Sequence, residues 1–292
     1  MQTLRETITR FTSRLHAANV DSPRLSTEVL LAFALQRERS DLIKDLLLHP
    51  DLPVDEATLG IAENLIQRRE KGEPVAYITG RKEFYGRDFL VTPATLIPRP
   101  DTETLVETAI NFAKSYTQVN PCFIDLGTGS GAIAVTLAVE LSAWHGTAVD
   151  ISLDALRVAE QNALRLGATN LDFVLCDFLS PQLPHGPYNM VLANPPYVSE
   201  EEYRTLSHEV AGFEPKSALV PPADKTEGLR HLVGILHRAE GLLVPGGLLL
   251  MEMGCTQGDA LLKEASVLSS LCDCHVIHDL AGLPRVFHAV RS

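Results

Sequence analysis

Residues 122–132 read CFIDLGTGSGA, and this stretch decides the fold class of the chain. An apolar segment ends in the pair Asp125-Leu126, a glycine-rich turn follows, and an apolar helical segment begins at the turn. Glycines let a backbone pass close to a ligand, and unpaired amides at a helix start attract negative groups. Gly127, Gly129 and Ala132 also satisfy the G-x-G-x-x-G/A spacing of dinucleotide sites. The turn alone therefore fits a cofactor site or a tight turn that binds nothing.

Downstream of residue 104, strand-like and helical segments alternate, which is typical of a parallel sheet with crossover helices. The predicted strands are Cys122–Leu126, Gly146–Asp150, Asp172–Cys176, Tyr188–Ala193, Leu248–Met253, Cys274–Asp279 and Val286–Val290. The predicted helices are Gly131–Leu141, Leu153–Leu166, Thr226–Leu243 and Thr256–Leu268. We therefore expect an α/β domain over residues 104–292, with a mostly parallel sheet flanked by helices.

Residues 1–72 are predicted to form a small helical bundle. Apolar residues recur at helical spacing from Leu4 to Leu15, which predicts a first amphipathic helix. Ser22 and Pro23 predict the N-cap and first residue of a second helix, and Ser40 is expected to cap a third. A fourth is expected over residues 55–71. No spacing in this block is typical of a catalytic site, which favours a docking role for a substrate or partner.

Residues 73–103 are expected to link the two domains. The stretch EFYGRDFLVTP (residues 83–93) alternates around Gly86, as a β-hairpin does. It leads into IPRP (residues 97–100), where two prolines stiffen the chain before the next helix.

Two acidic residues follow the ends of the next predicted strands. Asp150 closes the second strand, where a carboxylate can accept two hydrogen bonds from a ribose diol. Asp177 and Phe178 follow the third strand, where an acid could reach an adenine amine and a ring could lie on the adenine face. Asp177 is equally suited to capping a turn. These residues favour a nucleoside cofactor but do not separate NAD from S-adenosylmethionine.

The segment Asn194-Pro195-Pro196-Tyr197 follows an apolar strand directly, and this separates the two cofactors. Asn194 offers a carbonyl acceptor, and Pro195 stiffens the chain while its own carbonyl faces outward. Two convergent carbonyls can hold both hydrogens of a planar NH2 group, and Tyr197 supplies a flat face against it. Such a pocket beside a nucleoside site indicates group transfer onto nitrogen. The alternative is a proline-rich turn with a packed tyrosine.

Charge and cysteine content narrow the classes of partner. The chain has 292 residues and a net charge of −12, which argues against a broad basic face for duplex nucleic acid. Its 5 cysteines are an odd number without a C-x-x-C pair, which favours a reducing compartment over a disulfide framework. Cys272, Cys274, His275 and His278 match no common zinc spacing, so we expect strand residues there and no metal site.

Targeting signals are not expected. The longest apolar stretch, Gly241 to Gly254, is too short to cross a membrane and is interrupted by proline and glycine. The N-terminal residues contain no continuous apolar segment of the kind found in secretory signals. A cytoplasmic protein without membrane association is the expectation.

The motifs together resemble class I S-adenosylmethionine-dependent methyltransferases, and within them the glutamine methyltransferases of peptide chain release factors (the PrmC or HemK type). The matching segments are PVAYITG (74–80), EFYG (83–86), IPRPDTE (97–103), DLGTGSG (125–131), NPPY (194–197), FEP (213–215) and Ala218-Leu219. NPPY alone is shared with DNA and RNA amino-methyltransferases, whereas its combination with IPRPDTE is much more specific.

The resemblance implies a Rossmann-like fold, S-adenosylmethionine as cofactor, and methylation of the glutamine side-chain amide in the Gly-Gly-Gln loop of release factors. The implied cofactor contacts are Gly127, Thr128, Gly129, Ser130 and Gly131 with the methionine part, Asp150 with the ribose, Asp177 and Phe178 with the adenine, and Asn194 beside them. Asn194, Pro195 and Tyr197 would hold the glutamine amide as the catalytic residues, with Pro196 also in the substrate pocket. Some family members are expected to carry tryptophan at position 178, where this chain has phenylalanine.

Three alternatives stay open. A nucleic-acid amino-methyltransferase acting on adenine or cytosine shares NPPY and would flip a base into the same pocket. An NAD-dependent oxidoreductase explains the glycine turn and Asp150 but gives NPPY no role. A binding module with a vestigial pocket is the third.

The long connection over residues 198–226 is a candidate lid or binding loop, and we favour a place for Phe213-Glu214-Pro215 at the substrate mouth.

Overall fold

The computed structural model describes residues 2–117, 119–222 and 226–292, which divide into two compact units. The helical unit comprises the chain up to Arg81 together with Ser207–Phe213. The sheet unit comprises Lys82–Leu206 and Glu214–Ser292. No described helix is long and apolar enough to span a membrane.

The described part of the helical unit is built from the four predicted helices and two further short helices. Its elements are β1 (Gln2–Thr3), α1 (Leu4–Ala17), α2 (Pro23–Ala34), α3 (Arg39–Leu48), β2 (Pro53–Val54), α4 (Glu56–Glu70), α5 (Val75–Thr79) and α10 (His208–Ala211). Buried residues of α1, such as Ile8 and Phe11, share one apolar core with α2 and α4. Thr3 and Glu6 form a capping box at the start of α1, and Asp55 caps α4.

One of the two predicted caps in this unit is confirmed in position and the other is wrong. Ser22 is the N-cap of α2 and Pro23 its first residue, but Ser22 adopts a left-handed conformation and its side chain makes no capping hydrogen bond. Ser40 lies inside α3, which begins one residue earlier at Arg39. The Arg39 guanidinium pairs with the buried carboxylate of Glu28 at 2.7 Å, and this ion pair holds the start of the helix.

The helical unit extends past residue 72, where the expected linker begins. The short helix α5 buries Ile78 in the helical core, so the unit ends at Arg81. Arg69, which is 4% exposed, pairs with Glu209 at 2.8 Å and so attaches Ser207–Phe213 to the same unit. The predicted hairpin then follows as β3 (Arg81–Phe84) and β4 (Arg87–Leu90). Tyr85 and Gly86 both have positive φ, as a two-residue hairpin turn requires.

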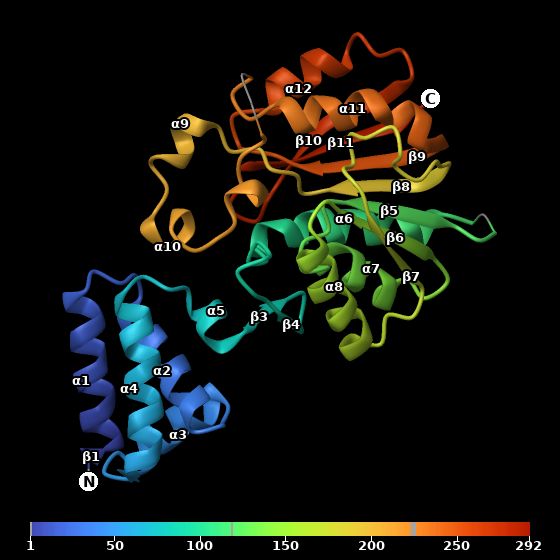
Figure 1. Ribbon diagram of the computed structural model, residues 1–292. Helices are drawn as coiled ribbons and strands as arrows, with labels where there is room; N and C mark the ends of the chain where they lie inside the picture. The colour runs from blue at the N-terminus through green and yellow to red at the C-terminus, as the bar shows by residue number, and fades with distance from the viewer. Residues whose placement is uncertain (1, 118, 223–225) are drawn as a thin grey trace. The chain divides into compact units, whose positions relative to one another are not determined.

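The sheet unit contains a seven-stranded sheet in the order β10-β11-β9-β8-β5-β6-β7 (Figure 1). The strands are β5 (Cys122–Leu126), β6 (His145–Asp150), β7 (Leu171–Leu175), β8 (Tyr188–Ala193), β9 (Leu243–Glu252), β10 (Leu271–His278) and β11 (Pro284–Arg291). The helices and 3₁₀ turns are η1 (Pro100–Thr102), α6 (Glu103–Ser115), α7 (Ala132–Glu140), α8 (Leu153–Leu166), α9 (Glu200–Tyr203), η2 (Lys216–Ala218), α11 (Arg230–Leu242) and α12 (Gly258–Ala265). The mostly parallel α/β fold is thereby confirmed.

Strands β5 to β9 pair in parallel, and β11 runs against its neighbours β9 and β10. The chain proceeds from β5 outward to β7 and then returns to place β8 on the other side of β5. The carboxyl ends of β5 and β8 therefore lie side by side where the strand order reverses. Ligands of open α/β sheets bind at such a reversal.

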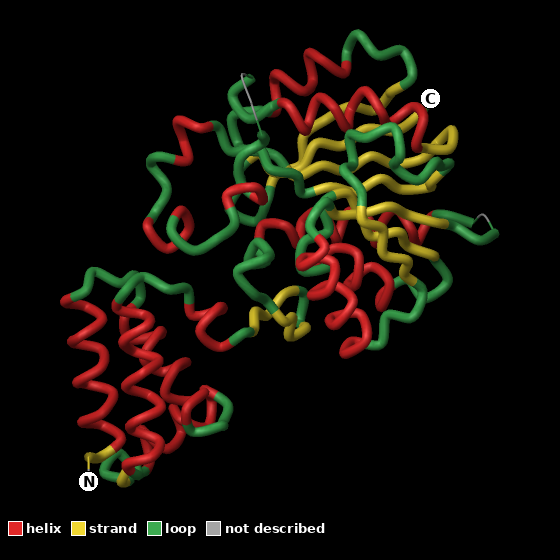
Figure 2. The backbone as a smooth tube through the Cα atoms, viewed as in Figure 1, coloured by secondary structure: helices red, strands yellow, loops and turns green. Residues whose placement is uncertain are grey.

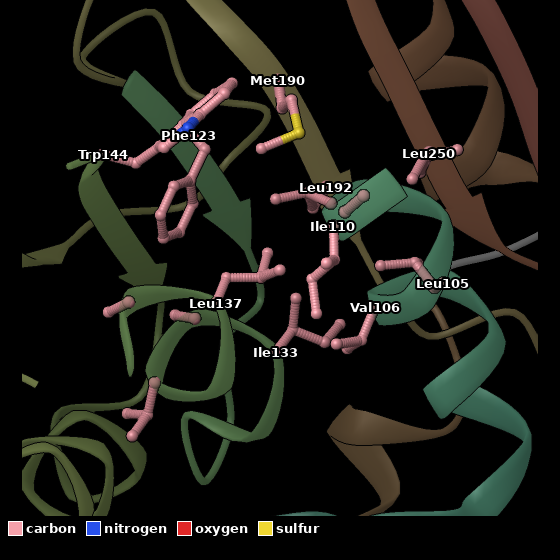
Figure 3. Close-up of a cluster of buried hydrophobic side chains, with 14 of the residues drawn as sticks. Leu105, Val106, Ile110, Phe123, Ile133, Leu137, Trp144, Met190, Leu192 and Leu250 are labelled. Atoms are coloured by element: carbon pink, nitrogen blue, oxygen red, sulfur yellow. The ribbon is translucent and has the colours of Figure 1, made fainter. Parts of the chain in front are cut away.

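Two apolar layers cover the sheet. Helices α6, α7 and α8 lie on one face and α11 and α12 on the other (Figures 1 and 2). Side chains alternate accordingly along the strands: Phe123 and Leu192 join the first layer, whereas Ile124 and Val191 join the second. Figure 3 shows the first layer, where Leu137 and Ile133 of α7 lie close to Phe123 and Leu192.

Strand β9 begins earlier than expected, at Leu243 instead of Leu248. Leu243 pairs with Tyr188 ahead of Pro245-Gly246-Gly247, and the pairing resumes with Leu248 opposite Met190. The predicted proline-glycine break is thus an irregularity inside one strand. Helix α11 accordingly ends at Leu242.

Gly131 is needed at the start of α7 for both conformation and space. Its φ is +82°, and an added Cβ would lie 2.9 Å from Val135 Cγ2 and 3.1 Å from Ala159 Cβ.

Gly167 at the end of α8 is a matched comparison for Gly131. Its φ is +78°, and an added Cβ would have no neighbouring atom within 4 Å among the described residues. Gly167→Ala should lose only the left-handed backbone cost of about 1–2 kcal/mol. Gly131→Ala should lose about 1–3 kcal/mol more through crowding, measured as the difference in free energy of unfolding in urea. Equal losses would show that the contacts around Gly131 relax freely.

Candidate active site

A cavity of about 570 Å³ lies at the carboxyl ends of the parallel strands, within the usual size range of small-molecule sites. Most of the predicted site residues line it: Gly127, Thr128, Gly129, Ser130, Asp150, Asp177, Phe178, Asn194 and Pro196. Gly131 is not among the lining residues, and its place in the structure is the steric one at the start of α7. The parallel strands thus bring four separate sequence motifs to one cavity.

The glycine loop is fixed by bonds to the neighbouring strand. The amides of Gly127 and Thr128 both donate to the Val149 carbonyl, at 2.8 and 2.9 Å. Gly127 and Gly129 have φ values of +80° and +56°, which side-chain-bearing residues rarely adopt. The loop therefore presents bare backbone to the cavity in one defined conformation.

Asp150 closes β6 with its carboxylate at the cavity wall, 8% exposed. Its oxygens accept hydrogen bonds from the amides of Gly129 (2.9 Å) and Ser152 (2.8 Å). Burial raises its pKa, and these amide bonds oppose the rise. Each carboxylate oxygen carries two lone pairs, so each can accept one further hydrogen bond. The side chain is therefore suited to a vicinal diol.

Asp125 lies fully buried at the end of β5, beneath the glycine loop. Its Oδ2 accepts a hydrogen bond from the Thr128 hydroxyl at 2.7 Å, and its Oδ1 has no partner within the described chain. Burial raises the pKa of Asp125 to about 7. A cation in the cavity that Thr128 lines would favour the ionised form of this carboxyl.

Asp177 and Phe178 lie on the cavity wall after β7. Asp177 Oδ1 accepts from the Leu179 amide at 2.8 Å, so the residue does cap a turn, and its second oxygen is left for another donor. The Phe178 ring packs edge-on against His231, with 5.0 Å between ring centroids. Both residues lie at the expected edge of the sheet and Asp177 caps a turn, while their contact with an adenine stays a prediction.

A second pocket of about 60 Å³ adjoins the first and is lined by Pro195, Tyr197 and Glu252. Four residues line both: Leu96, Arg99, Asn194 and Ala218. The NPPY segment therefore lies where a large cavity meets a pocket that has room for only a few heavy atoms.

Asn194 and Tyr197 connect to two residues that were not among the predicted site residues, Thr102 and Glu252. Asn194 Nδ2 donates to Thr102 Oγ1 at 3.2 Å, and Thr102 Oγ1 donates to Glu252 Oε2 at 2.5 Å. The Tyr197 hydroxyl donates to the other oxygen, Glu252 Oε1, at 2.9 Å. Burial raises the pKa of Glu252, and burial together with Glu252 raises the pKa of Tyr197. The sequence signal that could have identified Glu252 is an acidic residue at the end of an apolar run, LLLMEM (residues 248–253).

Glu214 holds the cavity wall formed by residues 97–99. Its side chain accepts the Ile97 amide at 3.0 Å and pairs with the Arg99 guanidinium. Pro215 lines the cavity, whereas Phe213 belongs to the helical unit. Two segments of the resemblance, IPRPDTE and FEP, thus meet through Glu214.

The cysteines and histidines near the C-terminus lie on β10, as expected. In the described part of the chain, one group of three potential metal ligands is found, Asp273 and His275 on β10 with His288 on β11. Asp273 and His275 are exposed, and both imidazole Nδ1 atoms contact the Asp273 carbonyl, at 3.0 and 3.1 Å. Cys272, Cys274 and His278 are not part of this group.

The chain is a class I methyltransferase: the sheet order and the glycine-loop cavity fit this class, and a family match shows it. Residues 119–282 match the family described as a methyltransferase domain, and residues 6–80 match the PrmC N-terminal domain. The solved methyltransferase from Pyrococcus furiosus has the same fold, with TM-score 0.50 and 16% identity, covering 78% of this chain and 98% of that one.

The chain belongs to the release factor glutamine methyltransferase family. The enzyme of that name from Nitratidesulfovibrio vulgaris is 48% identical, covering 96% of this chain and 92% of its own length. Those from Koribacter versatilis (39% identical, 97% of each chain) and Vibrio cholerae (39% identical, 94% and 92%) are similar over comparable spans. The resemblance drawn from the sequence is confirmed, and the oxidoreductase and vestigial-module interpretations are wrong.

Proposed function

We propose that this protein transfers a methyl group from S-adenosylmethionine to the side-chain amide nitrogen (N5) of the glutamine in the Gly-Gly-Gln motif of peptide chain release factors. The observation that carries the proposal is the position of Asn194 and Pro195, where the cofactor-sized cavity adjoins a pocket of about 60 Å³. A planar carboxamide fits such a pocket. The family names of the relatives support the same substrate.

The residues of the large cavity fit the methyl donor. Residues Gly127–Ser130 line the cavity where the methionine part would lie, Asp150 has two oxygens for the ribose hydroxyls, and Asp177 and Phe178 would flank the adenine. When bound, the donor supplies an electrophilic methyl group on a sulfonium. Asp125, buried below the loop, adds a carboxyl whose ionised form a cation would stabilise.

The NPPY segment would hold the acceptor. Asn194 Oδ1 and the Pro195 carbonyl would accept the two N–H bonds of the glutamine amide, and the Tyr197 ring would pack on its plane. This arrangement aims the amide nitrogen from the small pocket toward the large one. A gap of roughly 3–3.5 Å in line with the C–S bond is what the transfer needs.

The rate comes mainly from positioning and from the acceptors. An amide nitrogen is a poor nucleophile because its lone pair is delocalised into the carbonyl. If that pair took up the methyl group that the donor would supply, with the old bonding pair left on the donor's sulfur, positive charge would develop on the amide nitrogen. The carbonyls of Asn194 and Pro195 stabilise that charge through its N–H bonds. One proton then leaves the nitrogen for water.

The helical unit would serve as the docking module for the release factor. The proposed location is the cytoplasm, where translation occurs and where the five cysteines, all free in the structure, stay reduced.

Mass spectrometry of a release factor incubated with the protein and S-adenosylmethionine tests the proposal. The expected result is a gain of about 14 Da, one CH2, on the Gly-Gly-Gln glutamine. A release factor whose glutamine is replaced by alanine is the control and should gain nothing. Parallel reactions with radiolabelled donor on total RNA and DNA should stay unlabelled. Label in nucleic acid with none in the release factor would overturn the assignment.

A further inference from the structure

We infer that Thr102 and Glu252 are positioning residues that fix which end of the Asn194 amide faces the substrate. The inference rests on the proposed role of Asn194 as acceptor of the glutamine N–H bonds. An asparagine amide has an oxygen end and an NH2 end of nearly the same shape. Only the oxygen end can accept from a substrate NH2.

The network starts at Glu252, the last residue of β9, which is 2% exposed. One carboxylate oxygen accepts from Thr102 at 2.5 Å and the other from Tyr197 at 2.9 Å. Burial raises the pKa of Glu252, while the hydrogen bonds from Thr102 and Tyr197 and the nearby Arg285 guanidinium oppose the rise and favour the carboxylate form. Arg285 itself pairs with Asp279 at 3.2 Å and Asp101 at 3.4 Å. A carboxylate accepts hydrogen bonds and donates none.

The direction of each remaining bond follows. A threonine hydroxyl has one hydrogen, and Thr102, 4% exposed, donates it to Glu252. Towards Asn194 the same oxygen can therefore only accept. Asn194 must present Nδ2 to Thr102, as the 3.2 Å contact shows, and its Oδ1 lies at the opposite end of the amide. Glu252 thus sets the polarity of the acceptor through Thr102, while it holds the Tyr197 ring by the hydroxyl.

Three substitutions test this inference without changing the volume of the site greatly. Glu252→Gln keeps the shape but introduces an NH2 group that must donate to Thr102 or Tyr197. Thr102→Val removes the hydroxyl and keeps the branched shape. Both should lower kcat about 10–100-fold, because the Asn194 amide is then free to turn its donors toward the substrate. The KM for the release factor and the Kd for S-adenosylmethionine should stay within about threefold. Thr102→Ser keeps the hydroxyl and should retain at least about a third of kcat.

The outcomes separate positioning from other roles. Wild-type kcat in Thr102→Val would overturn the inference. The only role left for Glu252 would then be to accept a proton. An equal loss in Thr102→Ser and Thr102→Val would show that packing matters and hydrogen-bond direction does not. If the wild-type protein methylates no release factor, the proposed function fails. The hydrogen-bond network is then tested separately by NMR, through the side-chain NH2 signal of Asn194. Protection of those protons from exchange should be lost in Thr102→Val and kept in Thr102→Ser, and equal protection in all three proteins would overturn the inference.

Discussion

Replacing Asn194 with alanine is expected to lower kcat for release-factor methylation by about 10²–10⁴. Alanine removes the Oδ1 acceptor that would hold the glutamine NH2, both before transfer and as charge develops on nitrogen. It leaves the glycine loop and Asp150 in place, because those are held by bonds to Val149, Gly129 and Ser152. The Kd for S-adenosylmethionine should therefore change much less, by about tenfold at most. Steady-state kinetics with a purified release factor, paired with calorimetric titration of the donor, measures both quantities.

Asn111→Ala is the matched control for this variant. Asn111 lies exposed on α6, and its side chain contacts only the exposed Lys114, at 3.3 Å, among the hydrogen bonds described. It should leave kcat and donor binding unchanged. Turnover of Asn194→Ala within about threefold of wild type would mean that other groups hold the amide.

The sequence was sufficient to place the residues that follow strand ends. Gly127, Asp177 and Asn194 follow strands of the parallel sheet, and Asp150 is the last residue of another. Parallel strands end at one edge, so the order of the chain alone predicts that these residues share a cavity. The same logic does not distinguish a residue that lines the cavity from one that supports it. Gly131, predicted as a contact, instead makes room for Val135 and Ala159.

Contacts between segments that are far apart in the sequence could not be predicted from the order of the strands. Thr102 and Glu252 are 150 positions apart, and their hydrogen bond depends on how η1 lies against the end of β9. Glu214 and Arg99 are joined over 115 positions in a similar way. Helix starts were only partly predictable: Ser22 and Pro23 do begin α2, whereas Ser40 lies inside α3, where the neighbouring Arg39 pairs with Glu28 of α2. Local preference is weaker than these tertiary contacts.

The two pockets assign separate tasks to residues that adjoin one another in space. Asp150 contacts only the large cavity, whereas Pro195 and Tyr197 contact only the small one among the pocket-lining residues described. Asn194 contacts both. Substitutions should therefore separate into those that change donor affinity and those that change turnover, and Asp150 is the clearest case of the first kind.

Asp150→Ala is expected to raise the Kd for S-adenosylmethionine by about 10²–10⁴. The two charge-assisted hydrogen bonds proposed to the ribose hydroxyls would contribute about 1.5–3 kcal/mol each, and both would be lost. The variant also releases the Gly129 amide, which the carboxylate holds at 2.9 Å, so the glycine loop loses an anchor. Asp150→Asn keeps one acceptor oxygen and should lose less affinity for the donor.

Calorimetric titration measures the affinity of Asp150→Ala for the donor. At saturating donor, its kcat should recover most of the wild-type value, because the amide pocket is intact. Asp172→Ala is the matched control: this exposed residue of β7 pairs with the exposed His145 at 2.8 Å, and its removal should leave the Kd unchanged. A Kd for Asp150→Ala within about threefold of the control would place the ribose elsewhere in the cavity.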